Sequence, residues 1–298
     1  MKSAGERSLY RARSLDDAVA ALADHEPVAE VLAGATWIMR ADLREEFGDR
    51  YYISIGGLAD LRKIDITTEA ISIGGCATHA ELARGLHGIP GMNALADAAA
   101  KSANPAVRNV ATIGGNICTI DFAAADLVPA LLCLGAIVEY RHIRGTERID
   151  LTEFLAKRES LRKTAIVTRI IVLRTERLSA HVRLPLRKAG DYPVAIVSMS
   201  VAMGKGTAID EAIIAVGSVE TTARRWTRLE SAIRGQTLDL ETITSLAKAS
   251  IGEFSGRDGV DAPGWYRTQV LPTLVRRAFE DLHFHDGGLD VAASQRQR

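Results

Sequence analysis

The sequence predicts a mixed α+β protein built from two successive domains. Short apolar strands alternate with helical segments as far as residue 174, and long apolar β-runs followed by helices replace them afterwards. A chain of 298 residues is also long enough to bury two cores. We therefore expect a first domain over residues 1–176, a second over 177–285, and a disordered polar tail over 286–298.

The first domain opens with a predicted helix and a short strand. In SLDDAVAALAD, residues 14–24, Ser14 is placed to cap a helix with two acids in its first turn and apolar residues at helical spacing. The strand AEVLA follows and ends at the turn Gly34-Ala35-Thr36. A second helical segment is expected over residues 36–46.

The rest of this domain continues the alternation. YYISIGG and AISIGG are predicted strands that end in paired glycines, and in the following helix Thr78 and Glu81 have the spacing of a capping box. Further helices are expected over residues 93–103 and 126–134, and a strand over 136–142.

The second domain begins with long apolar runs. HVRLPLRKAGDYPVAIVSMSVAM and TAIDEAIIAVGSVE are predicted strands, joined through the hairpin turn GKG. Helices are expected over residues 222–234 and 239–252. The last predicted helix, GWYRTQVLPTLVRRAFEDL, places five apolar residues along one face: Trp265, Val270, Leu274, Ala278 and Leu282.

Composition and charge exclude several classes of function. Lys plus Arg equals Asp plus Glu at 37 each, and no basic block interleaves with aromatic residues, which argues against nucleic-acid binding. The longest apolar stretches are too short to span a membrane, and no signal peptide is apparent. The three cysteines form no CxxC pair, so we expect no iron–sulfur cluster and no metal site. The expectation is a cytoplasmic protein.

Two glycine-containing turns share one predicted design, in which a strand leads through small residues to a Thr or Asn and then a helix. They are Ala33–Thr36 and Thr112–Asn116. Backbone N–H groups exposed in such turns bind phosphate without charged side chains, so a dinucleotide could engage one turn with each phosphate. Neither turn has the GxGxxG or GxxxxGK[ST] spacing. The alternative, that each is a tight turn without a ligand, stays open.

Several stretches in a fixed order resemble one family: SLDDAVAAL, VLAGATWIM, ISIGGCATHAEL, NPAVRNVATIGGN, ADLVPALLCLGA, RKAGDYPVAIVS and YRTQVLPTLVRRA. The chain is similar to the flavin-binding medium subunit of the molybdenum hydroxylases, the family of carbon monoxide dehydrogenase and xanthine dehydrogenase. The resemblance implies a two-part FAD-binding domain of the vanillyl-alcohol-oxidase (PCMH) type, split near residue 55. A smaller α+β domain like that of the carbon monoxide dehydrogenase flavoprotein follows.

The resemblance assigns residues in both domains to FAD. They are Val31, Leu32, Ala33, Gly34, Ala35, Thr36, Trp37 and Ile38 in the first turn, Ala111, Thr112, Ile113, Gly114, Gly115 and Asn116 in the second, and Thr119, Asp126, Lys188 and Tyr192 beyond.

Each of these groups has an expected role. Gly114 and Gly115 would close on the diphosphate, where a Cβ would collide with it. Asn116 and Thr119 would donate or accept side-chain hydrogen bonds, and Asp126 would accept one from a cofactor hydroxyl. Tyr192 would cover the isoalloxazine ring. This sequence departs from the family at Ala35, where a glycine is usual, and over residues 120–122.

The function implied is an electron-transfer subunit of a molybdenum hydroxylase, with no catalytic residue of its own. The partners implied are an iron–sulfur small subunit, a large subunit with the molybdenum cofactor, and a soluble acceptor such as NAD, oxygen or a quinone. Two alternatives stay open. One is an autonomous FAD-dependent oxidase or dehydrogenase of a small molecule, and the other is a binding module that has lost its flavin.

Overall fold

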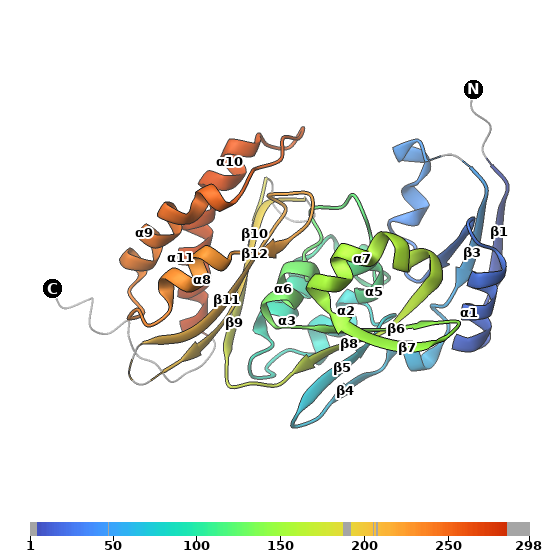
Figure 1. The fold of residues 1–298 in the computed structure, drawn as a ribbon, viewed down its shortest axis with the longest axis horizontal. Helices are drawn as coiled ribbons and strands as arrows, with labels where there is room; N and C mark the ends of the chain where they lie inside the picture. Colours follow the sequence, from blue (N-terminus) through green and yellow to red (C-terminus); the bar gives the residue numbers. More distant parts are fainter. Residues whose placement is uncertain (1–4, 47, 187–191, 205, 207, 285–298) are drawn as a thin grey trace.

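The computed structural model describes residues 5–46, 48–186, 192–204, 206 and 208–284. Three β-sheets follow one another along this described part of the chain (Figure 1). Helices cover the second and third sheets, and the third sheet lies between two groups of helices.

The first sheet is small and parallel. Its strand order is β1 (Arg7–Arg11), β3 (Arg50–Ser54) and β2 (Ala29–Leu32). Helix α1 (Leu15–Asp24) packs on it, and the Ser14 side chain accepts a hydrogen bond from the Asp17 N–H, which confirms the predicted cap. The apolar residues of α1 and of the strands form a core of their own.

The second sheet is antiparallel and has the order β4 (Ile64–Ile66), β5 (Ala70–Gly74), β8 (Ala165–Leu173), β6 (Ile137–His142) and β7 (Gly145–Asp150). Its core is shared with helices that follow β5 and surround β6 in sequence: α2 (His79–Gly85), α3 (Asn93–Lys101), α5 (Ile113–Cys118), α6 (Leu127–Cys133) and α7 (Leu151–Thr164). The short helix α4 (Pro105–Arg108) has no buried residue. The Thr78 and Glu81 capping box of α2 is present as predicted.

The third sheet is antiparallel, with the order β12 (Arg224–Arg225), β11 (Ile209–Gly217), β10 (Pro193–Met203) and β9 (Leu178–Pro185). The helices of the C-terminal part pack on one face: α8 (Thr227–Ile233), α9 (Leu240–Ser250), α10 (Gly264–Gln269) and α11 (Leu271–Phe284). Helices α3 and α6 pack on the other face, as the centre of Figure 1 shows.

Because successive side chains of a strand point to opposite faces, the third sheet contributes to two cores. In β11, Ile214 belongs to the core under α11, whereas Ala215 belongs to the core of the second sheet. Polar side chains on the face that packs against α3 and α6 form hydrogen bonds with the ends of these two helices. The Ser179 hydroxyl accepts from the Ala94 N–H at the start of α3 at 2.9 Å, and the Ser200 hydroxyl donates to the Cys133 carbonyl at the end of α6 at 2.6 Å.

Several details differ from the sequence-based expectation, and one is that the last predicted helix is divided into two. The predicted helix over residues 36–46 consists of two short 3₁₀ helices, η1 (Ile38–Arg40) and η2 (Asp42–Arg44), and further 3₁₀ turns occur at η3 (Ala59–Arg62) and η4 (Ile251–Glu253). Helix α7 was not predicted; most of its surface is charged, so it has little apolar periodicity. Trp265 is 63% exposed instead of buried with the rest of its predicted face.

No helix in the described ranges is both long and apolar enough to cross a bilayer. The predicted tail 286–298 and two residues of the GKG turn region lie outside those ranges.

Candidate functional site

The first predicted turn packs backbone against backbone on the segment that precedes the second. A Cβ added to Gly34 would lie 2.0 Å from the Val110 carbonyl oxygen and 3.1 Å from the Ala111 Cα. Only glycine allows so close an approach. Gly34 and Ala111 are 77 positions apart in the sequence. The two predicted turns are therefore neighbours in space although they are distant along the chain.

The first turn also presents a row of unused backbone donors. Across the described ranges, no acceptor has hydrogen-bonding geometry to the N–H groups of residues 34–38, whereas the next amide, Met39 N–H, donates to the Ala35 carbonyl at 3.0 Å. Ala35 has a φ of +61°, in the left-handed region. Successive N–H groups around a left-handed residue form a concave, partly positive surface that suits an anion. This segment meets the predicted requirement for phosphate binding.

Ala35→Gly is expected to stabilise the protein. The left-handed conformation costs an L-residue roughly 1–2 kcal/mol, and the flexibility of glycine in the unfolded chain costs roughly 0.5–1 kcal/mol. The free energy of unfolding in urea should therefore rise by about 0.5–1 kcal/mol, with FAD affinity unchanged or slightly higher. Ala33→Gly, whose φ is not positive, is the matched control and should be destabilising. An equal loss in both variants would contradict strain at Ala35.

The second predicted turn is a helix start, which corrects the expected source of its hydrogen-bond donors. Thr112 caps α5, and Gly114 and Gly115 lie in its first turn without positive φ. Their N–H groups are used by the protein: Gly114 donates to the Gly75 carbonyl at 2.9 Å and Gly115 to the Thr112 hydroxyl at 3.2 Å. The N–H groups of Ile113 and Asn116 are also bonded. This segment therefore offers side chains instead of bare amides.

Asn116 is the side chain of this segment that best fits a ligand. Its Oδ1 atom is buried and has no hydrogen-bond partner in the described part of the chain. A buried polar atom without a partner is costly, so a bound group that donates to it would be stabilised. The Thr119 hydroxyl donates to the Gly115 carbonyl at 2.6 Å and keeps its acceptor capacity. The Ile113 side chain, by contrast, is a fully buried core residue.

An aromatic cluster joins the first turn to the third sheet. The ring centroids of Trp37 and Phe122 are 4.8 Å apart, and those of Phe122 and Tyr192 are 5.2 Å apart in an edge-to-face arrangement. Arg40 Nη1 donates to the Tyr192 hydroxyl at 2.8 Å. The Arg44 guanidinium lies 4.2 Å from the Trp37 ring centre. Tyr192 thus lies at the predicted site although it is 152 positions from Arg40 in the sequence.

Asp126 also has charged partners within the protein, besides its predicted role of accepting from a cofactor hydroxyl. Its side chain is buried, and Oδ1 lies 3.0 Å from Arg183 Nε and 3.7 Å from His181 Nε2. Arg183 Nη1 also donates to the Lys101 carbonyl at the end of α3 at 2.6 Å. His181 Nδ1 lies 2.8 Å from the Ser198 hydroxyl. The carboxylate therefore links α6 to strand β9.

His79 completes this buried polar region. It is the first residue of α2, its ring is buried, and its Nδ1 lies 2.7 Å from the Ser102 hydroxyl. Burial lowers the pKa of His79 to about 4, although the nearby Asp126 charge opposes that shift. The imidazole is therefore neutral at pH 7. Among the residues that the structure describes, no group of histidines, cysteines and carboxylates is placed to hold a metal ion.

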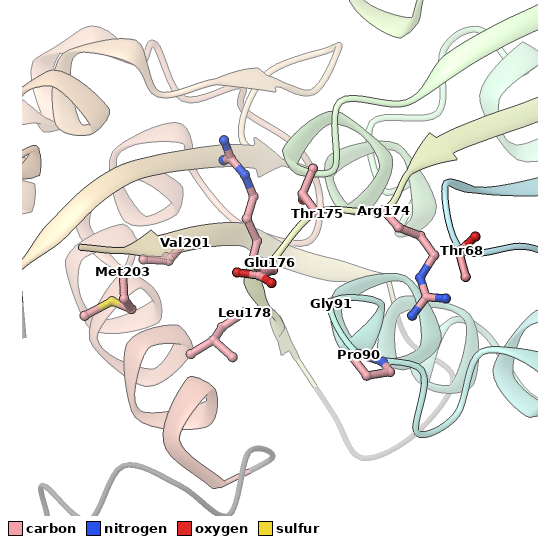
Figure 2. A pocket seen from close by; sticks show the side chains of 10 residues that line it. Thr68, Pro90, Gly91, Arg174, Thr175, Glu176, Leu178, Val201 and Met203 are labelled. Atoms are coloured by element: carbon pink, nitrogen blue, oxygen red, sulfur yellow. The ribbon is translucent and has the colours of Figure 1, made fainter. Parts of the chain in front are cut away.

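A cavity of about 570 Å³ lies elsewhere, beside the connection between β8 and β9 (Figure 2). Arg174, Thr175 and Glu176 border it on one side and Leu178, Val201 and Met203 on another. Arg174 is held by a hydrogen bond to the Thr67 carbonyl at 3.0 Å. None of the described residues that were predicted to bind a cofactor lines this cavity.

The structure thus brings together most of the predicted residues and adds others. The first turn meets Val110 and Ala111 directly, and Trp37 reaches Tyr192 through Phe122. Asp126 points to β9 instead, and Lys188 lies outside the described residues. Sequence reasoning missed the roles of Arg40, His181 and Arg183, since no local pattern marks a partner from a distant part of the chain.

Comparisons with known proteins identify two matching families. A family model described as the FAD binding domain in molybdopterin dehydrogenase matches residues 4–172, and one described as the CO dehydrogenase flavoprotein C-terminal domain matches residues 180–282. The predicted family resemblance and fold class are confirmed.

Similar proteins match over most of their length. The xanthine dehydrogenase FAD-binding subunit of Escherichia coli O157:H7 is 26% identical over 94% of this chain and 97% of its own. The 6-hydroxypseudooxynicotine dehydrogenase complex subunit alpha of Paenarthrobacter nicotinovorans is 28% identical over 89% and 90%. A chain of carbon monoxide dehydrogenase from Hydrogenophaga pseudoflava superposes with a TM-score of 0.85 at 22% identity, covering 96% of this chain and 99% of its own. That last likeness concerns the fold.

Proposed function

We propose that this chain is the electron-transfer subunit of a molybdenum hydroxylase. The chain belongs to the family of the FAD binding domain in molybdopterin dehydrogenase. FAD is its cofactor. The observation that carries the proposal is the row of unused N–H groups at residues 34–38, beside the aromatic cluster. Bound FAD supplies the electron exchange, and the protein supplies binding, orientation and electrostatics.

The residues present fit this cofactor. The amides of residues 34–38 would hold the diphosphate without a charged side chain. Asn116 would accept a hydrogen bond at its buried Oδ1, and Thr119 would add an acceptor next to it. The aromatic cluster with Tyr192 would cover the flat flavin ring.

We also propose the predicted division into residues 1–176, with a split near residue 55, and 177–285. The order of the three sheets along the sequence supports this division. The last strand of the first sheet, β3, ends at Ser54; the last strand of the second sheet, β8, ends at Leu173; and the third sheet begins with β9 at Leu178. The proposed tail 286–298 lies outside the described residues.

The proposed partners are an iron–sulfur small subunit and a large subunit with the molybdenum cofactor. The names of the relatives support this, since they are given as an FAD-binding subunit and as a complex subunit of dehydrogenases. Electrons would reach this chain from the small subunit and leave to NAD, oxygen or a quinone, in a cytoplasmic complex. The chain itself would hydroxylate nothing.

Purification with neighbouring reading frames tests this proposal. We expect mass spectrometry of the released cofactor to find FAD and not FMN, because FMN lacks the diphosphate that residues 34–38 would hold. Size-exclusion chromatography should give one peak that contains flavin, iron and molybdenum. The isolated chain should be reduced by dithionite and should turn over no hydroxylase substrate.

Three outcomes would contradict the proposal, and recovery of FMN alone would contradict the assignment of FAD. Recovery of no flavin even after reconstitution would remove the electron-transfer role and favour a binding module. Robust oxidation of a small molecule by the isolated chain would identify an autonomous oxidase instead. A flavin-loaded chain that recruits no iron-containing partner on co-expression would also count against the subunit role.

A further inference from the structure

A buried hydrogen-bond network surrounds the Ser218 carbonyl, where β11 ends. The Arg267 side chain, from α10, is fully buried, and its Nη1 donates to the Val194 carbonyl at 2.7 Å and to the Ser218 carbonyl at 3.2 Å. Arg257 Nε donates to the same Ser218 carbonyl at 3.1 Å. Two guanidinium groups thus converge on one backbone oxygen, next to the first residues of β10. We call these contacts the Ser218 network.

Ser218 connects two segments that are far apart in sequence. It has a φ of +65°, a left-handed conformation that a serine adopts only when its surroundings hold it there. Its N–H donates to the Ala123 carbonyl at 3.0 Å, and its hydroxyl donates to the Pro193 carbonyl. The network therefore fixes the backbone at Ala123 and at Pro193 in relation to each other.

These two anchored positions adjoin the aromatic cluster. Pro193 directly follows Tyr192, and Ala123 directly follows Phe122. The rings of Tyr192 and Phe122 meet edge to face at 5.2 Å, and Arg40 donates to the Tyr192 hydroxyl. The Ser218 network thus fixes the backbone next to each ring. Contacts with Trp37 and Arg40 hold the ring side chains themselves.

Burying the charged side chain of Arg267 in this position is unfavourable in free energy. Burial lowers the pKa of Arg267, and the neighbouring Arg257 charge lowers it further. Its Nε and Nη2 atoms have no hydrogen-bond partner among the described residues. An apolar side chain of similar volume would fill a core position at lower cost. The contacts that such an apolar side chain could not make are the hydrogen bonds from Arg267 Nη1 to the carbonyls of Val194 and Ser218.

We propose that Arg267 is a positioning residue for the flavin site, and that it holds Tyr192 and Phe122 against the first turn through the Ser218 network. This inference rests on the proposed function, since it assumes that the aromatic cluster contacts the flavin of bound FAD. Arg267 itself does not touch the cofactor. It acts through the backbone of Pro193, Val194 and Ser218.

The test compares Arg267→Met and Arg267→Lys with the wild type, and uses Arg277→Met as the matched control, because Arg277 is exposed on α11 in the same part of the chain. Visible circular dichroism of reconstituted protein reports the surroundings of the flavin ring, and titration gives the FAD dissociation constant. Hydrogen exchange of flavin-free protein reports the backbone at residues 119–125 and 192–199. Thermal melting reports overall stability.

Arg267→Met should change the visible dichroism in the same direction as Tyr192→Ala and raise the FAD dissociation constant about tenfold, as expected for losing hydrogen bonds from a charged donor. Exchange should become about tenfold faster in the two segments and stay unchanged in the β2 segment 29–32. Arg267→Lys, which keeps one charged donor, should restore part of each effect. Arg277→Met should behave as wild type.

A purely structural role would give a different pattern. If Arg267→Met only lowers the melting temperature, with dichroism and segment exchange unchanged, the inference is wrong. If Arg267→Met does not fold, Ser218→Gly decides, because it keeps the left-handed backbone and removes only the two hydroxyl contacts, one to the Pro193 carbonyl and one from Arg257 Nη2. It should produce the same changes more weakly, and a wild-type signature would overturn the inference.

The two proposals fail in distinguishable ways. If the wild type binds no FAD, the proposed function fails, whereas the exchange measurement on flavin-free protein still decides whether Arg267 fixes the two segments. If the wild type binds FAD and the Arg267 variants match the control in every readout, only the positioning role is lost.

Discussion

Gly34→Ala is expected to abolish FAD binding and to destabilise the protein. The added Cβ would lie 2.0 Å from the Val110 carbonyl oxygen, and both contacting atoms belong to backbones that cannot rotate away. The first turn would have to move off Val110 and Ala111, which would displace the amides of residues 34–38 as a group. We expect at least a hundredfold loss of FAD affinity by titration, and overpacking of this kind costs about 1–3 kcal/mol or more of unfolding free energy.

Gly57→Ala is the matched control, because a Cβ at Gly57 would have no neighbour within 4 Å and Gly57 has no positive φ. It should keep wild-type affinity. Equal FAD binding by the Gly34 and Gly57 variants would show that the first turn does not hold the cofactor. Gly115→Ala gives an intermediate case, since its Cβ would meet only the Thr112 hydroxyl at 3.0 Å.

Arg183→Met is expected to have a comparably large effect on stability. It would remove the guanidinium 3.0 Å from Asp126 Oδ1 and leave a carboxylate that is only 5% exposed without that counter-ion. Removing one partner of a buried ion pair typically costs about 3–5 kcal/mol. The hydrogen bond to the Lys101 carbonyl at the end of α3 would be lost as well. Urea denaturation of the single variant should show the loss directly.

A double-mutant cycle with Asp126→Asn isolates the pair. The double variant Arg183→Met/Asp126→Asn should recover much of the lost stability, because the uncompensated charge is gone. Arg169→Met, on β8 at an exposed position, is the control and should change stability by less than about 0.5 kcal/mol. A cycle without coupling would mean that Asp126 does not depend on Arg183.

Local patterns predicted the elements that local physics determines. The Ser14 cap of α1 and the Thr78 capping box of α2 are set by hydrogen bonds between residues three apart, and both are present. The departure noted at Ala35 is visible in the structure as a left-handed alanine. In each case the deciding atoms lie within one turn of the backbone.

The second glycine segment shows where this reasoning failed. Paired glycines were interpreted as a turn, since glycine disfavours helices, but Thr112 caps α5 and the glycines lie inside its first turn. The reason is a tertiary contact: a Cβ at Gly114 would lie 2.6 Å from the Gly75 carbonyl. Gly114→Val would therefore disturb the fold itself and not the cofactor site alone.

Contacts across the chain could not be derived from spacing. The hydrogen bond from Arg40 to Tyr192 joins residues 152 positions apart. The pairing of Asp126 with Arg183 depends likewise on how α6 packs against β9. Which charged residue meets which carboxylate is decided by the packing of sheets and helices, and neither side of such a pair carries a local signature.

The two-sided burial of the third sheet has a consequence for how electrons would enter and leave. A lid or hinge needs an interface that can open without exposing core residues. Here the Ser179 and Ser200 hydroxyls form hydrogen bonds with the ends of α3 and α6, and β11 contributes side chains to both cores. Domain closure on the microsecond-to-millisecond scale is therefore a poor way to control access here. We expect side-chain rotations around Tyr192 and Arg40, which take nanoseconds or less at an exposed site, to set how an acceptor approaches.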